Sequence, residues 1–106
     1  MKQTSTKIPE LLRRLSRQTL DTAYLGAVNG SDIYQVQEGW QREILINDPA
    51  VTTVMSATEF EEAVRAPEIS SIFVPHNAAV TQEVAERILN RNALLKTIYW
   101  EASQVK

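Results

Sequence analysis

The stretch Ser70-Ser71-Ile72-Phe73-Val74-Pro75-His76-Asn77 decides the fold that this sequence predicts. Its three consecutive apolar residues are typical of a buried strand. The run stops at Pro75, and the only histidine of the chain, His76, follows directly. Ligands of α/β proteins bind where buried strands end ahead of helices. We therefore expect a strand over 70–74 and look first for function at its carboxyl end.

Strands and helices are predicted to alternate on both sides of this strand. Before it, residues 51–55 form a short β-type run, and a helix then ends ahead of Pro67. Two capping boxes could begin that helix, Ser56 with Glu59 or Thr58 with Glu61.

After the strand, Asn77 or Thr81 caps a second helix, which has an inner apolar stripe, and 96–100 is the last strand. The second half therefore predicts a β-α-β-α-β unit with parallel pairing and right-handed crossovers.

The first half predicts one helix and a meander. Apolar residues at positions 8, 11, 12 and 15 indicate an amphipathic helix over 8–20. Asn29-Gly30, between the β-type runs 22–28 and 33–37, is a strong hairpin signal. A turn over 38–41 and a third strand over 42–47 would complete a three-stranded antiparallel meander.

The whole chain is thus expected to be an α+β or α/β protein: an N-terminal helix, the meander and then β-α-β-α-β, forming one mixed sheet with helices packed on it. With 106 residues, we expect a single globular domain over 1–106, with loose tails at 1–7 and 102–106.

Composition excludes several kinds of chemistry. The chain has no cysteine, which rules out disulfides, thiolate metal sites and cysteine nucleophiles. Most zinc sites draw on several Cys or His ligands, and the chain has one histidine, so we expect no metal and no cofactor. The absence of a long apolar run predicts no membrane span, and we expect a cytoplasmic protein.

Charge is unevenly distributed along the chain. Residues 1–20 carry five basic residues and one acidic residue, a net charge of +4, whereas residues 21–106 carry −6. Arg13, Arg14 and Arg17 lie on the outer face of the predicted N-terminal helix. Together with Trp40 and Trp100 they form our candidate interaction surface, because Trp and Arg are over-represented among binding hot spots.

A second candidate is the rim at the carboxyl ends of the predicted parallel strands. It would present the side chains of five residues: Ser56, Thr58, His76, Asn77 and Glu101. A hydroxyl, an imidazole and a carboxylate are the set that Ser-His-acid catalysis needs. However, the sequence has no Gly-x-Ser-x-Gly elbow, and helix capping accounts for the two hydroxyls without any catalytic role. We therefore assign no catalytic residue.

These observations leave three hypotheses for function. The favoured one is a non-enzymatic protein-interaction module, of the inhibitor or regulatory-subunit type, which binds another protein or a second copy as a homodimer. The first alternative is a small enzyme or ligand binder that uses the rim around His76. The second is a nucleic-acid binder through the basic N-terminal helix, which the acidic remainder of the chain and the lack of nearby aromatic residues disfavour.

Overall fold

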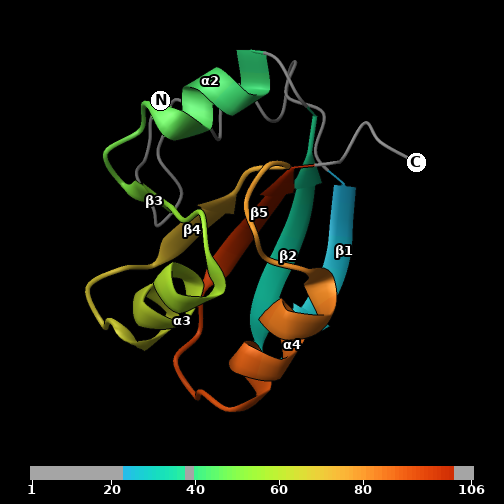
Figure 1. The fold of residues 1–106 in the computed structure, drawn as a ribbon, viewed down its shortest axis with the longest axis vertical. Coiled ribbons are helices and arrows are strands. Elements are labelled where there is room, and N and C mark those ends of the chain that lie inside the picture. The colour runs from blue at the N-terminus through green and yellow to red at the C-terminus, as the bar shows by residue number, and fades with distance from the viewer. Residues whose placement is uncertain (1–22, 38–39, 102–106) are drawn as a thin grey trace, which may run out of the picture.

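The structure is a computed structural model that describes residues 23–37 and 40–101 (Figure 1). The predicted helix over 8–20 and the two predicted tails lie outside these ranges. No helix within them is both long and apolar enough to cross a membrane. The elements in chain order are β1 (Ala23–Val28), β2 (Ser31–Val36), α2 (Trp40–Ile46), β3 (Val51–Thr53), α3 (Ala57–Arg65), β4 (Ser71–Val74), α4 (Gln82–Asn90) and β5 (Thr97–Glu101).

The five strands form one mixed sheet in the order β1-β2-β5-β4-β3. β3, β4, β5 and β2 are parallel to one another, and β1 pairs with β2 in the antiparallel direction. β4, the strand of the opening stretch, lies between β3 and β5. The predicted parallel β-α-β-α-β unit is therefore confirmed, as is the mixed α/β class.

The predicted hairpin is also confirmed. Asn29 has a φ of 52° and Gly30 a φ of 88°, the left-handed conformations that an Asn-Gly turn supplies. The Asn29 side chain ties this turn to the end of α4, because its Nδ2 donates to the carbonyl oxygens of Leu89 at 2.9 Å and Asn92 at 2.8 Å. The pairing of β1 with β2 has a bulge at Leu25.

The predicted third strand and meander are wrong. Residues 40–46 form a helix, so Trp40 begins α2 rather than lying in a turn, and β2 pairs in parallel with β5. Short apolar runs do not distinguish a strand from a helix. In the structure Gln41 and Leu45, four positions apart, are buried, whereas Ile46 is exposed. A spacing of four residues is typical of one face of a helix. Just before this helix, the backbone N–H of Gln37 donates to Gln41 Oε1 at 2.9 Å.

Helices α3 and α4 each begin directly after an N-cap residue. Ser56 is the N-cap of α3, and its Oγ accepts from the Glu59 N–H at 3.1 Å. Thr81 caps α4 in the same way, at 3.2 Å from the Val84 N–H. Of the alternatives, Thr58 therefore lies inside α3 and Asn77 lies ahead of α4.

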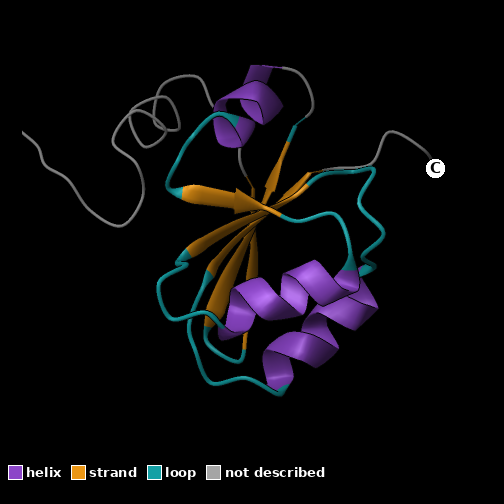
Figure 2. Ribbon diagram, turned by 60° about the vertical axis from the view of Figure 1, so that its left-hand side comes forward, coloured by secondary structure: helices purple, strands orange, loops and turns teal. Residues whose placement is uncertain are grey.

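The sheet separates two hydrophobic cores (Figure 2). α3 and α4 cover one face, where Ile72 and Val74 of β4 join the larger core. α2 covers the other face, where Leu45 packs with Phe73 and Tyr99. Successive residues of β4 thus enter opposite cores, which is why the strand is apolar at every position.

Tyr99 gives the fold a measurable pH dependence. Burial raises the pKa of its hydroxyl above the ordinary value near 10, with Tyr34 and Asp48 adding to the effect. Because the folded state keeps this proton when the unfolded chain releases it, stability should fall above about pH 10, by up to about 1.4 kcal/mol per pH unit. Urea unfolding of the Tyr99→Phe variant between pH 9 and 11.5 should show a shallower decline than wild type. Tyr34→Phe removes only a lesser contributor to the raised pKa of Tyr99 and should change the slope less than Tyr99→Phe does. Equal slopes in wild type and Tyr99→Phe would contradict the expectation.

Candidate functional site

The parallel strands end at the carboxyl edge of the sheet. At this edge, neighbouring strands lead to helices on opposite faces of the sheet. β2 continues into α2 on one face, whereas β4 continues into α4 on the other (Figure 2). β5 lies between these two strands and ends at Glu101. Open α/β sheets bind ligands at such a position. The sequence-predicted rim therefore lies where a ligand would be expected.

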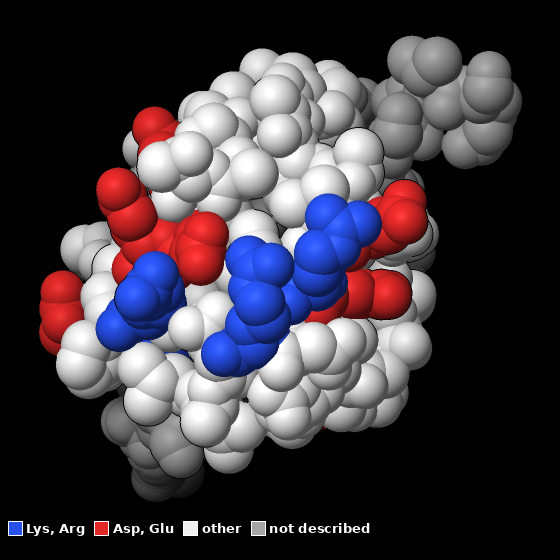
Figure 3. Space-filling view, turned by 60° about the horizontal axis from the view of Figure 1, so that its bottom comes forward, with Lys and Arg blue, Asp and Glu red and all other residues white. Residues whose placement is uncertain are grey.

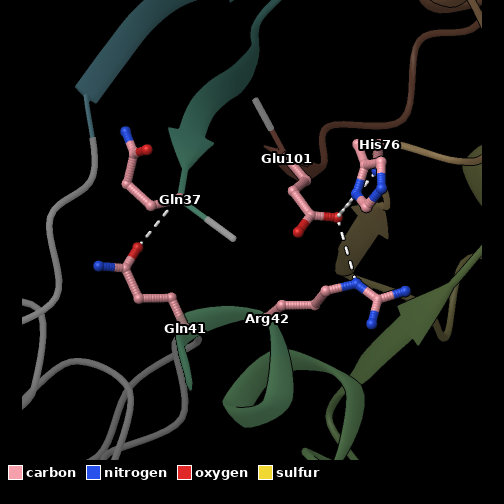
Figure 4. Close-up of polar contacts among 5 residues, drawn as sticks. All are labelled: Gln37, Gln41, Arg42, His76 and Glu101. Atoms are coloured by element: carbon pink, nitrogen blue, oxygen red, sulfur yellow. Dashed lines mark hydrogen bonds and ion pairs between the residues drawn. The ribbon is translucent and has the colours of Figure 1, made fainter. Parts of the chain in front are cut away.

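A buried carboxylate occupies this position (Figure 4). The Glu101 side chain has no exposed surface, and its Oε1 lies 3.3 Å from Arg42 Nε, 2.8 Å from the His76 backbone nitrogen and 3.0 Å from His76 Nδ1. The His76 backbone N–H and the Arg42 Nε–H both donate to this oxygen, which accepts from each. Three segments, α2, β5 and the turn after β4, thus meet at one oxygen atom.

This cluster connects α2 to the sheet through the ion pair between Arg42 and Glu101. A seven-residue helix is too short to be stable alone, so it depends on contacts such as this ion pair. The second carboxylate oxygen, Oε2, is buried and has no hydrogen-bond partner within the described part of the chain. The arginine and histidine side chains keep 29% and 32% of their surface exposed, whereas the carboxylate is covered. The cluster is therefore an internal ion-pair network that closes the carboxyl edge.

The structure brings together only part of the predicted rim. His76 and Glu101 are in contact, as the topology required. Ser56 serves as the N-cap of α3, Thr58 is exposed on that helix, and Asn77 is exposed in the turn. Sequence reasoning missed Arg42, which it placed on a strand, and no local pattern links this residue to a carboxylate 59 positions away.

The described residues offer no metal site, since no group of three or more His, Asp or Glu side chains in those ranges is arranged to hold an ion. Figure 3 shows lysine and arginine side chains beside acidic ones on the lower face. Glu61 pairs with Arg65 at 3.5 Å and Arg91 at 3.7 Å, and Glu83 pairs with Arg87 at 3.6 Å. Acidic partners thus offset the arginines on α3 and α4.

A second feature, which we call the groove, lies between β1 and α4. It has a volume of about 270 Å³, and strands β1, β2 and β5 form its floor. Ile33 and Trp100 line the floor, and Ala85 and Leu89 of α4 line the wall. Trp100, from the candidate interaction surface, thus lies half-buried in an open apolar depression.

The rim of the groove is formed by an edge strand that carries no charge. Leu25 of β1 is 46% exposed there, although a leucine in a strand usually packs on a core. At Gly26 an added Cβ atom would meet no atom within 4 Å, so the space above this part of the strand is open. The acidic side chain of Glu86 stands on the opposite wall. The groove is therefore apolar at its floor and acidic at one wall.

The remaining residues of the candidate interaction surface cannot be placed relative to the groove. Arg13, Arg14 and Arg17 lie outside the described residues, and the side chain of Trp40 is not among those described. Comparison with known proteins supplies no further guide: no family model, no curated protein and no solved structure matches the chain.

Proposed function

We propose that the protein is a non-enzymatic interaction module that binds an amphipathic helical segment of another protein in the groove between β1 and α4. The observation that carries this proposal is the exposed Leu25 at the rim of an apolar groove whose floor contains Trp100. Helix-in-groove recognition places a few apolar side chains of a partner in such a depression. Tryptophan in a pocket is a frequent hot spot of protein interfaces.

The charge of the groove defines the chemistry of the partner. Glu86 lines one wall and forms no ion pair with any residue in the described ranges. A basic residue beside the apolar stripe of a partner helix would face this carboxylate. Complementary charge of this kind speeds association and selects among partners. The proposed ligand is therefore an apolar helix face with a basic flank.

Leu25→Asp should weaken partner binding while leaving the fold intact. The side chain is already half-exposed, so the change in unfolding free energy should stay within about 0.5 kcal/mol. A charge at the rim should weaken the affinity at least about tenfold, because loss of a hot spot costs more than about 1 kcal/mol. The partner retained by the wild-type protein from its native cell would be purified, and its dissociation constant measured by calorimetry against each variant.

Leu95→Asp is the matched control, since Leu95 is 66% exposed and does not line the groove. Equal loss with both variants, or loss with neither, would contradict the proposal. Sedimentation at high concentration tests the competing occupant. A wild-type dimer that Leu25→Asp converts to a monomer would show that the groove binds a second copy instead.

A further inference from the structure

The turn between β1 and β2 contains the dipeptide Asn29-Gly30. In an Asn-Gly pair, the backbone nitrogen of the glycine can attack the side-chain amide carbon of the asparagine, since glycine has no Cβ atom to hinder the approach. Asn29 and Gly30 are both exposed, and their φ angles of 52° and 88° lie in the left-handed region. Water therefore reaches the residue pair that undergoes this reaction most readily.

The fold holds the Asn29 amide against the end of α4. Its Nδ2 donates to the carbonyl oxygens of Leu89 at 2.9 Å and Asn92 at 2.8 Å. The last carbonyl groups of a helix lack the usual partner within the helix, so an amide that arrives from the hairpin helps to cap them. A side-chain amide has two N–H groups, and these two bonds use both. The hydrogen bonds therefore connect the turn to the C-terminal end of α4.

We propose that Asn29 is a one-way chemical switch, in which hydrolytic deamidation at Asn29-Gly30 releases the end of α4 from the hairpin. The Gly30 backbone nitrogen attacks Cγ of Asn29, the Cγ–Nδ2 bond breaks, and ammonia leaves with the proton of the attacking nitrogen. Water then opens the cyclic imide to aspartate, or to isoaspartate, in which the backbone runs through Cγ. The reaction consumes water and releases ammonia, and no electrons are transferred.

Either product loses the hydrogen bonds to α4. An ionised carboxylate has no hydrogen to donate, so it would face the carbonyl oxygens of Leu89 and Asn92 as a negative charge. It would also lie at the C-terminal end of a helix, where the macrodipole disfavours negative charge. Isoaspartate in addition lengthens the backbone of a turn whose geometry depends on its length. The product cannot restore the bonds, so the switch operates in one direction.

The release of α4 would alter the groove, because Ala85 and Leu89 of this helix form one wall. The inference nevertheless goes beyond the proposed function, since the end of α4 is released whether or not the groove binds a partner. Both experiments below use the free protein. Failure of the helix-binding proposal would leave their outcomes unchanged, and their failure would leave the groove as a binding site.

The hydrogen bonds to α4 also set the rate of the reaction. The Asn29 side chain must leave the two carbonyl oxygens before it can turn onto the Gly30 nitrogen, so the rate follows the fraction of molecules in which this contact is open. Two hydrogen bonds together lower that fraction by about tenfold. The folded protein therefore modifies itself more slowly than the unfolded chain.

Mass spectrometry of peptides from the aged wild-type protein tests the reaction. Asn29 should convert to aspartate and isoaspartate at neutral pH, and at least about tenfold faster in urea that unfolds the chain, because the bonds to α4 are then absent. Asn77 is the internal control, since it is exposed in a turn but precedes Ala78, and it should remain an amide in the folded protein. No conversion at Asn29, equal conversion at Asn77, or no acceleration in urea would overturn the proposal.

Hydrogen exchange of the Asn29→Asp variant tests the release of α4. The backbone N–H groups of Arg91 and Asn92 donate to carbonyl oxygens at the end of this helix, and both should exchange several-fold faster than in wild type. Asn29→Ala, which removes the donors without adding a charge, should show a smaller acceleration. The Phe60 N–H in α3 is the control and should keep its wild-type rate. Wild-type exchange at Arg91 and Asn92, or equal acceleration at Phe60, would show that Asn29 does not control the end of α4.

Discussion

Phe73→Ala is expected to lower the free energy of unfolding by about 4 kcal/mol, because truncating a fully buried phenylalanine removes its transfer free energy and leaves a cavity. Phe73 has no exposed surface and is the residue of β4 that enters the core beneath α2. It pairs with Tyr99 of β5 on one side and Thr53 of β3 on the other. The substitution would therefore weaken the packing of β3, β4, β5 and α2.

A loss of this size approaches the whole stability of a small domain, which is about 5 to 15 kcal/mol. Urea denaturation followed by circular dichroism should show a large fall in the midpoint with little change in slope. Phe73→Leu, which keeps most of the volume, should cost less than half as much. Leu95→Ala, at an exposed position, should stay within about 0.5 kcal/mol of wild type. A small effect of Phe73→Ala would contradict the buried position of this residue between β3 and β5.

Arg42→Met is expected to lower the free energy of unfolding by about 3 kcal/mol, because it leaves the buried Glu101 carboxylate without its cation. The arginine side chain is partly exposed, so water compensates for some of the loss. The carboxylate itself is covered; His76 would still contact its Oε1, whereas its Oε2 has no partner among the described residues. Methionine retains the aliphatic packing of the arginine stem.

The double variant Arg42→Met/Glu101→Leu separates the charge effect from the packing effect. It should recover most of the lost stability, because replacing both members of a buried ion pair by apolar residues is often close to neutral. Arg65→Met is the matched control, since its pair with Glu61 is exposed and should contribute about 0.5 kcal/mol or less. If the double variant is as unstable as Arg42→Met, the charge of Glu101 is not the cause.

The closed carboxyl edge bears on how the molecule could act. The switch point of an open sheet usually leaves a crevice for a ligand. Here an arginine, a histidine and a glutamate from the protein itself meet at that point. The apolar groove lies instead between the antiparallel edge strand and α4, which is why our functional proposal rests on Leu25 and Trp100 rather than on the predicted rim.

Local interactions determined the features that the sequence predicted correctly. Asn29-Gly30 specifies its turn, because both residues adopt positive φ angles at little cost. Ser56 and Thr81 begin their helices by accepting hydrogen bonds from backbone groups three residues ahead. The apolar run that ends at Pro75 predicted β4 as a buried strand, and the structure confirms it. Each of these signals lies within a few residues of the structure that it specifies.

The tertiary structure alone decided the features that the sequence did not. The local sequence of residues 40–46 is compatible with a strand or a helix. The segment is helical in the structure, where Leu45 packs with Phe73 and Tyr99. Arg42 and Glu101 are 59 positions apart, so no local sequence pattern could predict their contact. The groove likewise exists only once β1 and α4 lie side by side. Propensity acts over neighbouring residues, whereas long-range burial selects among the conformations that propensity leaves open.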